Sequence, residues 1–142
     1  MFDFGNYLPY LLNRAGARIA TSFSRDVRHL DIALQEWRVL ASLHFNGAQR
    51  MSDLSDHTSI DRTTLSRLIG RMEERHLVRR LRKTEDGREV HIKLTPEGAA
   101  MARQIVPVAE RYEEAALEGF SPEEAKQLKS MLKRIYANLD RL

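Results

Sequence analysis

The hydrophobic periodicity of the chain changes abruptly after Leu77, and this change limits the folds that the chain can adopt. Before that point, apolar residues recur every three or four positions, which is the spacing of an amphipathic helix. Residues 78–83 are instead strand-compatible, and apolar and polar side chains alternate over residues 90–95. Residues 85–88 lie between these segments and read as a turn. The pattern predicts one β-hairpin in an otherwise helical chain.

Two longer helices are predicted near the start of the chain, over residues 6–29 and 34–46. The first has apolar side chains at helical spacing, with arginines on another face. The second is expected to end at Asn46 and Gly47, because both residue types tolerate the left-handed conformation that often follows a helix.

Two closely spaced helices are predicted next. The first spans residues 53–58 with Ser52 as its N-cap, and the second begins after Asp61, which is its expected N-cap. The short gap between them favours a helix-turn-helix. The second helix is expected to bury the apolar residues at positions i, i+3, i+4 and i+7, namely Leu65, Leu68, Ile69 and Met72.

Two further helices are predicted after the hairpin. Thr95 and Pro96 have the N-cap and N1 chemistry of a helix start, and the helix is expected to reach Phe120 with a kink at Pro107. A capping box beginning at Ser121 starts the last helix, which is expected to end with the chain. The predicted fold class is mainly α with a small β-hairpin, or α+β.

Composition limits the function classes. The chain has 142 residues and no cysteine, which excludes disulfides, thiolate zinc sites and cysteine nucleophiles. No apolar run approaches the roughly 20 residues that cross a bilayer, and no basic segment precedes an apolar stretch at the start. We therefore expect a cytoplasmic protein of one domain without a membrane partner.

Positive charge is concentrated in the centre of the chain. Residues 60–93 hold ten Lys and Arg against six Asp and Glu, a net charge of +4, whereas the rest of the chain carries −1. A helix-turn-helix followed by a basic hairpin is typical of a winged helix, in which one helix enters the major groove of DNA.

These features resemble the MarR family of transcriptional regulators. The resemblance rests on Arg62-Thr63-Thr64-Leu65-Ser66-Arg67-Leu68, on the segment from Met72 to Arg80, on Asp86-Gly87-Arg88 and on Leu94-Thr95-Pro96-Glu97-Gly98. The chain departs from the family pattern at Ser59 and His76, where glycine is common, and at Lys83-Thr84, which replaces the usual Asp-Pro of the wing.

The resemblance implies a homodimer that binds a pseudo-palindromic operator and releases it when a small, often aromatic, anion binds. We expect residues 34–95 to form the DNA-binding region and residues 1–30 and 100–142 to form the dimerisation helices. Terminal helices of this length have little of their own chain to bury against. The expected interface residues are Phe4, Tyr7, Leu8, Leu128, Leu132, Ile135 and Leu139.

Candidate DNA contacts lie on the second helix of the helix-turn-helix and on the hairpin. Hydroxyl and arginine side chains there suit phosphates and guanine edges, although a solvated helix face is the alternative. The wing Arg suits the minor groove, with Asp86 holding its side chain. The candidates are Arg62, Thr63, Thr64, Ser66, Arg67, Arg71, Arg80, Lys83, Asp86 and Arg88.

A candidate site for an anionic aromatic ligand comprises Arg14, Arg18, Trp37 and His44. The alternatives are a solvent-facing arginine stripe and a core tryptophan. The five histidines lack metal-ligand spacing, and no nucleophile elbow, P-loop or dinucleotide fingerprint is present, so no metal, cofactor or enzymatic activity is predicted. The sequence predicts a DNA-binding regulator, with a protein-interaction module as the alternative.

Overall fold

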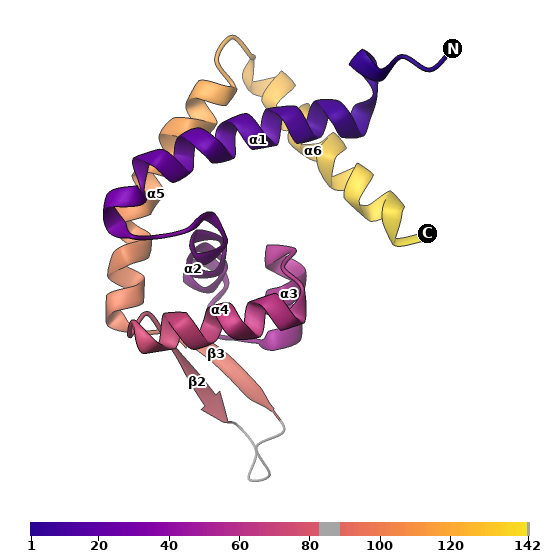
Figure 1. Ribbon diagram of the computed structural model, residues 1–142. Helices are drawn as coiled ribbons and strands as arrows, with labels where there is room; N and C mark the ends of the chain where they lie inside the picture. The colour runs from indigo at the N-terminus through magenta and orange to yellow at the C-terminus, as the bar shows by residue number, and fades with distance from the viewer. Residues whose placement is uncertain (83–88, 142) are drawn as a thin grey trace. The chain divides into compact units, whose positions relative to one another are not determined.

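The computed structural model describes residues 1–82 and 89–141 of the chain (Figure 1). The chain forms two compact units, Met1–Ala109 and Glu110–Leu142. The predicted turn at residues 85–88 lies outside the described residues, as do Lys83, Asp86 and Arg88.

The first helical segment is shorter than predicted. A 3-10 turn, η1 (Phe4–Asn6), precedes α1 (Leu8–Asp26). The predicted end at residue 29 is wrong because the backbone leaves α-helical geometry at Val27 and continues as a second 3-10 turn, η2 (Arg28–Leu30). Asp31, in the left-handed conformation with φ 54°, then ends that turn.

Helix α2 (Leu34–Asn46) has the predicted bounds. At its start, the Glu36 carboxylate accepts a hydrogen bond of 2.9 Å from the backbone N–H of Ala33. At its end, Gly47 adopts φ 78° and its N–H bonds to the carbonyl of Leu43. The glycine is needed here because side chains with a Cβ rarely adopt this conformation.

The helix-turn-helix consists of α3 (Met51–Thr58) and α4 (Arg62–Glu74). Ser52 is wrong as the N-cap of α3, because the helix begins before it and Arg50 occupies the cap position. Asp61 is confirmed as the N-cap of α4, where its carboxylate accepts from the N–H of Thr64 at 2.9 Å. The predicted core face of α4 is also confirmed, since at most 1% of each side chain is exposed at Leu65, Leu68, Ile69 and Met72.

The predicted hairpin is confirmed as β2 (Val78–Arg82) and β3 (Val90–Leu94), which pair antiparallel with Val78 opposite Leu94. A short strand that the sequence did not predict, β1 (Gln49–Arg50), pairs with the other edge of β3. The sheet order is therefore β1-β3-β2. The two longer strands extend away from the helices (Figure 1).

The chain passes from the sheet into α5 (Pro96–Ala116) through a tightly packed junction. Thr95 is buried, and its hydroxyl oxygen accepts from the N–H of Gly98 at 3.0 Å and donates to the carbonyl of His76. A Cβ at Gly98 would lie 2.0 Å from the carbonyl oxygen of Leu77, so only glycine fits. The predicted start of this helix is confirmed, but its end is at Ala116 rather than Phe120, and the kink at Pro107 stays a prediction.

The second unit contains the end of α5, helix α6 (Pro122–Asn138) and a 3-10 turn, η3 (Leu139–Arg141). The capping box is confirmed, with the Ser121 hydroxyl accepting from the N–H of Glu124 at 3.1 Å and the Glu124 carboxylate accepting from the N–H of Ser121 at 2.9 Å. An ion pair of 2.6 Å joins Lys129 to Glu113. No residue of α6 is buried.

The core lies in the first unit. It collects apolar side chains from α2, α3, α4, the sheet and α5 that are fully removed from solvent: Val39, Leu40, Leu54, Leu65, Ile69, Met72, Ile92 and Ile105. None of the helices among the described residues combines the length and apolar character that crossing a membrane requires.

Candidate nucleic-acid interface

Helix α4 presents a polar face opposite its buried face. Five of the predicted contacts on this helix are exposed, and they recur along one side of the helix at Arg62, Thr63, Ser66, Arg67 and Arg71. Thr64 differs, because it is half-buried and its hydroxyl donates to the Asp61 carboxylate at 2.7 Å. The exposed set combines three guanidinium groups with two hydroxyls, which suits phosphates and base edges.

The start of α4 carries a fixed negative charge. Hydrogen bonds from the backbone N–H and the hydroxyl of Thr64 hold the pKa of the Asp61 carboxyl below its ordinary value of 3.8, and Arg67 lowers this pKa further by charge attraction. The carboxylate satisfies a helix N–H that would otherwise lack a partner in the helix. It therefore fixes the first turn, which carries Arg62 and Thr63.

The end of α4 is hydrogen-bonded to the segment before α2 and to the first turn of α2. Arg75, at the C-cap of α4, donates through Nη1 to the carbonyl of Asp31 at 2.7 Å and to Oε2 of Glu36 at 3.3 Å. Glu36 is buried, with 8% of the residue exposed. These contacts connect the orientation of α4 to the start of α2.

A third attachment joins α4 to β2. The backbone N–H of Arg80 donates to Oε2 of Glu73 at 3.1 Å, and Nη2 of Arg80 donates to the carbonyl oxygen of Ser66 at 3.1 Å. The Arg80 side chain thus lies along α4, a placement that sequence periodicity does not reveal. The predicted role of Arg80 in binding phosphate stays a prediction, and the geometry gives it an additional role in bracing the sheet against the helix.

Two positive charges face each other on the exposed surface of the sheet. The register of β2 and β3 places Arg79 directly opposite Lys93, and both side chains are exposed. Like charges directly opposite each other destabilise a strand pair. Lys93 is not among the contacts predicted from the sequence, and counting back across the predicted four-residue turn at 85–88 would have placed Leu94 rather than Lys93 opposite Arg79. Because side chains alternate along a strand, the pair lies on the face of the sheet opposite Arg80, and it forms a local cationic patch that suits a polyanion.

The four residues predicted to bind a ligand have separate surroundings. The Arg14 guanidinium lies over the Tyr10 ring, with its carbon 5.6 Å from the ring centre, and Arg18 is exposed on α1. Trp37 packs against Phe23 with the ring centres 5.9 Å apart. The His44 ring lies edge-on to Phe45 at 4.9 Å. Of the four, Trp37 lines a hollow between α2 and the end of α3.

The predicted dimer residues are mainly exposed in their respective units. In the first unit, the rings of Phe4 and Tyr10 lie 4.3 Å apart, and Phe4, Tyr7 and Leu8 are exposed. In the second unit, Leu128, Leu132 and Leu139 are exposed and Ile135 is half-buried. Among residues 1–82 and 89–141, no three His, Asp or Glu side chains form a group that could hold a metal ion.

Comparisons with known proteins give the family. Residues 32–90 match the family model described as the MarR family. The homoprotocatechuate degradative operon repressor of Escherichia coli is 31% identical over 131 residues, which cover 92% of this chain and 88% of that repressor. This chain belongs to the MarR family. Its relatives are transcriptional regulators, and the winged-helix fold predicted from the sequence is confirmed.

Two solved structures of MarR-type regulators share this fold. NadR in complex with 4-hydroxyphenylacetate has a TM-score of 0.84 and 27% identity, covering 95% of this chain and 96% of that one. A mutant of MarR from E. coli in complex with operator DNA has a TM-score of 0.79 and 25% identity, covering 90% of this chain and 92% of that one.

Proposed function

We propose that this MarR-family protein is a sequence-specific DNA-binding repressor that a small aromatic acid releases from its operator. The observation that carries the proposal is the exposed face of α4, where Arg62, Arg67 and Arg71 alternate with hydroxyl side chains. The helix bearing this face is capped at its start and hydrogen-bonded to neighbouring elements at its end and along its length, so its backbone is held in a defined position. Such preorganisation favours recognition of a particular base sequence.

The binding geometry follows from the winged helix. Helix α4 enters the major groove, where arginine reads guanine edges and hydroxyls bind phosphates or bases. The cationic pair Arg79 and Lys93 attracts the neighbouring phosphates. Asp86 and Arg88, which the sequence places at the tip of the wing, reach the minor groove in this proposal, and Lys83 adds phosphate attraction.

The proposed active form is a homodimer. Residues 1–30 and 100–142 supply the dimerisation helices, and residues 34–95 supply the DNA-binding region. The exposed apolar side chains of the terminal segments support this division, because a second copy of the chain would remove them from water. In a two-fold dimer, the two α4 helices enter successive major grooves about 34 Å apart.

Release by a small molecule follows from differential affinity. A ligand that binds better to a conformation with unsuitable spacing of the two α4 helices lowers operator affinity by its preference for that conformation. The relatives support an aromatic acid, since NadR binds 4-hydroxyphenylacetate and a 31%-identical relative represses a homoprotocatechuate operon. The protein acts in this way without catalysing a reaction and does so in the cytoplasm.

The test is selection of bound DNA from a random library by the full-length protein. We expect a palindromic sequence with half-sites about 10 base pairs apart. Affinity for it should fall steeply with salt. Arg67→Ala should weaken binding by roughly 1–3 kcal/mol, whereas Arg25→Ala, which removes an exposed charge from α1, should not. Unselective binding in which both variants match the wild type would overturn the proposal in favour of a protein-interaction module.

A further inference from the structure

A buried glutamine lies among the apolar core residues of the first unit. Gln49, in β1, is only 6% exposed, and it is paired with Ile92 of β3, which is 0% exposed. Residues directly opposite each other in a sheet point to the same face, so the Gln49 side chain is directed inward. A buried amide lowers stability unless its donor and acceptor groups are hydrogen-bonded. The contacts of this amide therefore indicate why a polar residue occupies the position.

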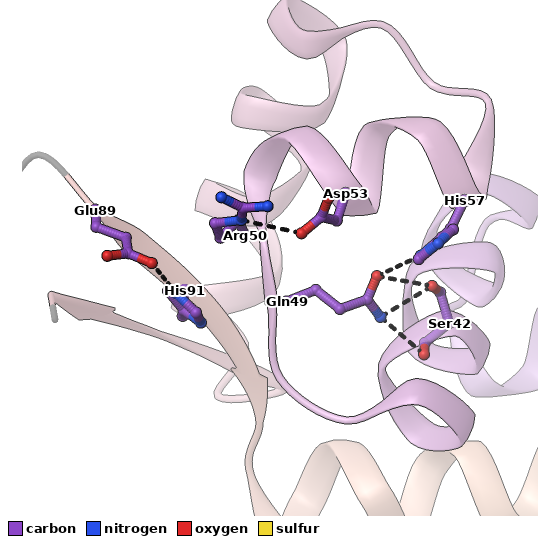
Figure 2. A network of polar contacts seen from close by, with 7 residues as sticks. All are labelled: Ser42, Gln49, Arg50, Asp53, His57, Glu89 and His91. Atoms are coloured by element: carbon purple, nitrogen blue, oxygen red, sulfur yellow. Dashed lines mark hydrogen bonds and ion pairs between the residues drawn. The ribbon is translucent and has the colours of Figure 1, made fainter.

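The amide of Gln49 joins β1 to two helices of the winged helix (Figure 2). Its Nε2 donates to the carbonyl oxygen of Ser42 in α2 at 3.0 Å and to the Ser42 hydroxyl oxygen at 3.1 Å. Its Oε1 lies 2.7 Å from Nδ1 of His57, which is in the last turn of α3. A carbonyl oxygen can only accept, so Nε2 faces Ser42 and Oε1 faces His57. One side chain thus connects a strand of the sheet to both α2 and α3.

The orientation of this amide determines the proton position on His57. Because Oε1 of Gln49 only accepts, Nδ1 of His57 carries a proton and donates it to that oxygen. In the neutral ring, Nε2 of His57 is then unprotonated. A charged ring has protons on both nitrogens, so the bond from Nδ1 to Gln49 is present in either state. The contact is therefore a constant attachment and not a pH switch.

The backbone pairing of β1 is too short to specify its own register strongly. The strand consists of Gln49 and Arg50, which are paired with Ile92 and His91 of β3. A shift of one residue would move the Gln49 side chain to the outer face of the sheet. The side-chain bonds of Gln49 to α2 and α3 form only when this side chain points inward. They therefore fix β1 against β3, which is one of the two strands of the wing.

The contact with His57 completes an attachment of α3 to β1 at both ends of the helix. The strand runs directly into α3, because Arg50 is the last residue of β1 and the N-cap of α3. The Arg50 guanidinium also forms an ion pair of 3.1 Å with Asp53 in the first turn of α3. At the other end, His57 bonds to Gln49, and Ser59, with φ 57°, begins the turn into α4. The position of Gln49 therefore determines how the wing and the helix-turn-helix are placed relative to each other.

We propose that Gln49 is a positioning residue for operator recognition. It holds the wing, through β1, and α4, through α3, at the separation that a particular DNA sequence requires. It does not touch the DNA, because its amide is buried and directed at Ser42 and His57. This inference rests on the proposed function, because it names a residue on which the proposed recognition of a base sequence depends. Loss of the amide should lower affinity for the operator and leave the attraction to phosphates unchanged, since no cation is removed.

The test measures the affinity of the full-length protein for two DNA duplexes of equal length, the operator selected by the wild type and a random sequence. Gln49→Met keeps the length of the side chain and removes both hydrogen-bonding groups. We expect it to bind the operator about tenfold more weakly, with unchanged affinity for the random duplex and an unchanged dependence on salt. The matched variant Gln35→Met, which replaces an exposed glutamine of α2, should bind both duplexes like the wild type.

Two variants of His57 test the same contact from α3 and keep the inference testable if Gln49→Met does not fold, which thermal melting checks. His57→Asn places an amide N–H close to the position of the ring Nδ1–H, so it should retain operator affinity. His57→Leu removes the donor and should lose about tenfold in operator affinity. NMR of the ring nitrogens of His57 in the free wild-type protein should show a proton on Nδ1.

Three results would overturn the inference alone, given an operator that the wild type selects. These are an equal loss of affinity for both duplexes, an unchanged operator affinity in the folded variants Gln49→Met and His57→Leu, and an Nδ1 of His57 that carries no proton. A wild-type protein that selects no operator would instead overturn the proposed function, and the inference with it.

Discussion

The winged-helix elements of the first unit, from α2 to β3, and α6 of the second unit differ in whether their apolar residues are buried. In Met1–Ala109, leucine and isoleucine side chains of α2, α3 and α4 are removed almost completely from solvent. In α6, the apolar stripe is exposed, and Met131 and Leu132 keep 50% and 39% of their surface in solvent. The winged helix therefore has a core of its own, whereas α6 requires another surface to cover it.

Removal of a core side chain from α4 should cause the largest loss in the free energy of unfolding. Leu65 is 0% exposed, so Leu65→Ala should lower the free energy of unfolding by about 2–5 kcal/mol. Urea denaturation followed by circular dichroism measures it. Leu128→Ala in α6 is the control, and an equally large loss there at a concentration where the protein is monomeric would refute the contrast.

The junction between the sheet and α5 should be next in sensitivity. Gly98→Ala places a methyl group against the carbonyl of Leu77, and we expect a loss of about 1–3 kcal/mol from overpacking. Gly16→Ala on α1, where a Cβ meets nothing within 4 Å, is the matched control and should not destabilise the protein. Thermal melting of both variants gives the comparison, and similar melting temperatures would contradict the close approach.

A substitution in the exposed apolar stripe of α6 should weaken association of two chains rather than folding of one chain. We expect Leu132→Ala to weaken dimerisation by about tenfold, or ~1.4 kcal/mol, while the circular dichroism spectrum stays unchanged. Sedimentation equilibrium over a range of protein concentrations measures this. Lys126→Ala, an exposed polar position of the same helix, serves as the control. A monomeric wild-type protein at micromolar concentration would rule out the proposed dimer.

A smaller effect of opposite sign is expected at His76, which adopts the left-handed conformation with φ 61°. Glycine adopts this conformation without a steric penalty, so His76→Gly should stabilise the protein by about 1 kcal/mol. Chemical denaturation measures the gain. Glu74→Gly, within the adjacent helix, should instead destabilise the protein, which separates the local conformation from a general effect of glycine.

The smallest predicted effect is a pH dependence at the start of α4. The folded-state pKa of Asp61 is lowered, so the stability it contributes is present above its unfolded value of 3.8 and is lost as pH falls through the lower folded value. Asp61→Asn keeps an N-cap oxygen but lacks this titration. Melting temperatures between pH 5 and pH 3 should therefore fall more for the wild type than for Asp61→Asn, and parallel curves would contradict the assignment.

The elements predicted correctly are those for which the start signal, the hydrophobic spacing and the end signal all indicate the same helix or strand. Helix α2 is the clearest case, since its apolar spacing and Asn46-Gly47 gave both bounds. The prediction of Ser52 as the N-cap is wrong because β1, paired with β3, ends at Arg50, which becomes the N-cap of α3. A strand of two residues leaves no periodic signal in the sequence. Helix boundaries can thus be predicted from neighbouring residue types where no pairing with a distant segment competes with them.

The candidate site was predictable only in its outline. The spacing of residues on α4 gave its exposed face, because helical geometry fixes which side chains share a side. The brace from Arg80 to Ser66 and the contact of His57 with Gln49 join residues whose proximity depends on how the helices pack. The residues predicted for the wing tip, Asp86 and Arg88, stay predictions.

The register that sets Arg79 opposite Lys93 gives salt two opposing effects on this molecule. Dissolved ions screen the repulsion within the sheet, so they stabilise the free protein, while they weaken its hold on a polyanion. A phosphate group near the pair would add two attractions that offset the repulsion between the two side chains. The nucleic acid then acts as a folding ligand of the sheet, and heparin, which carries charge without base sequence, should raise the melting temperature of the protein at low ionic strength.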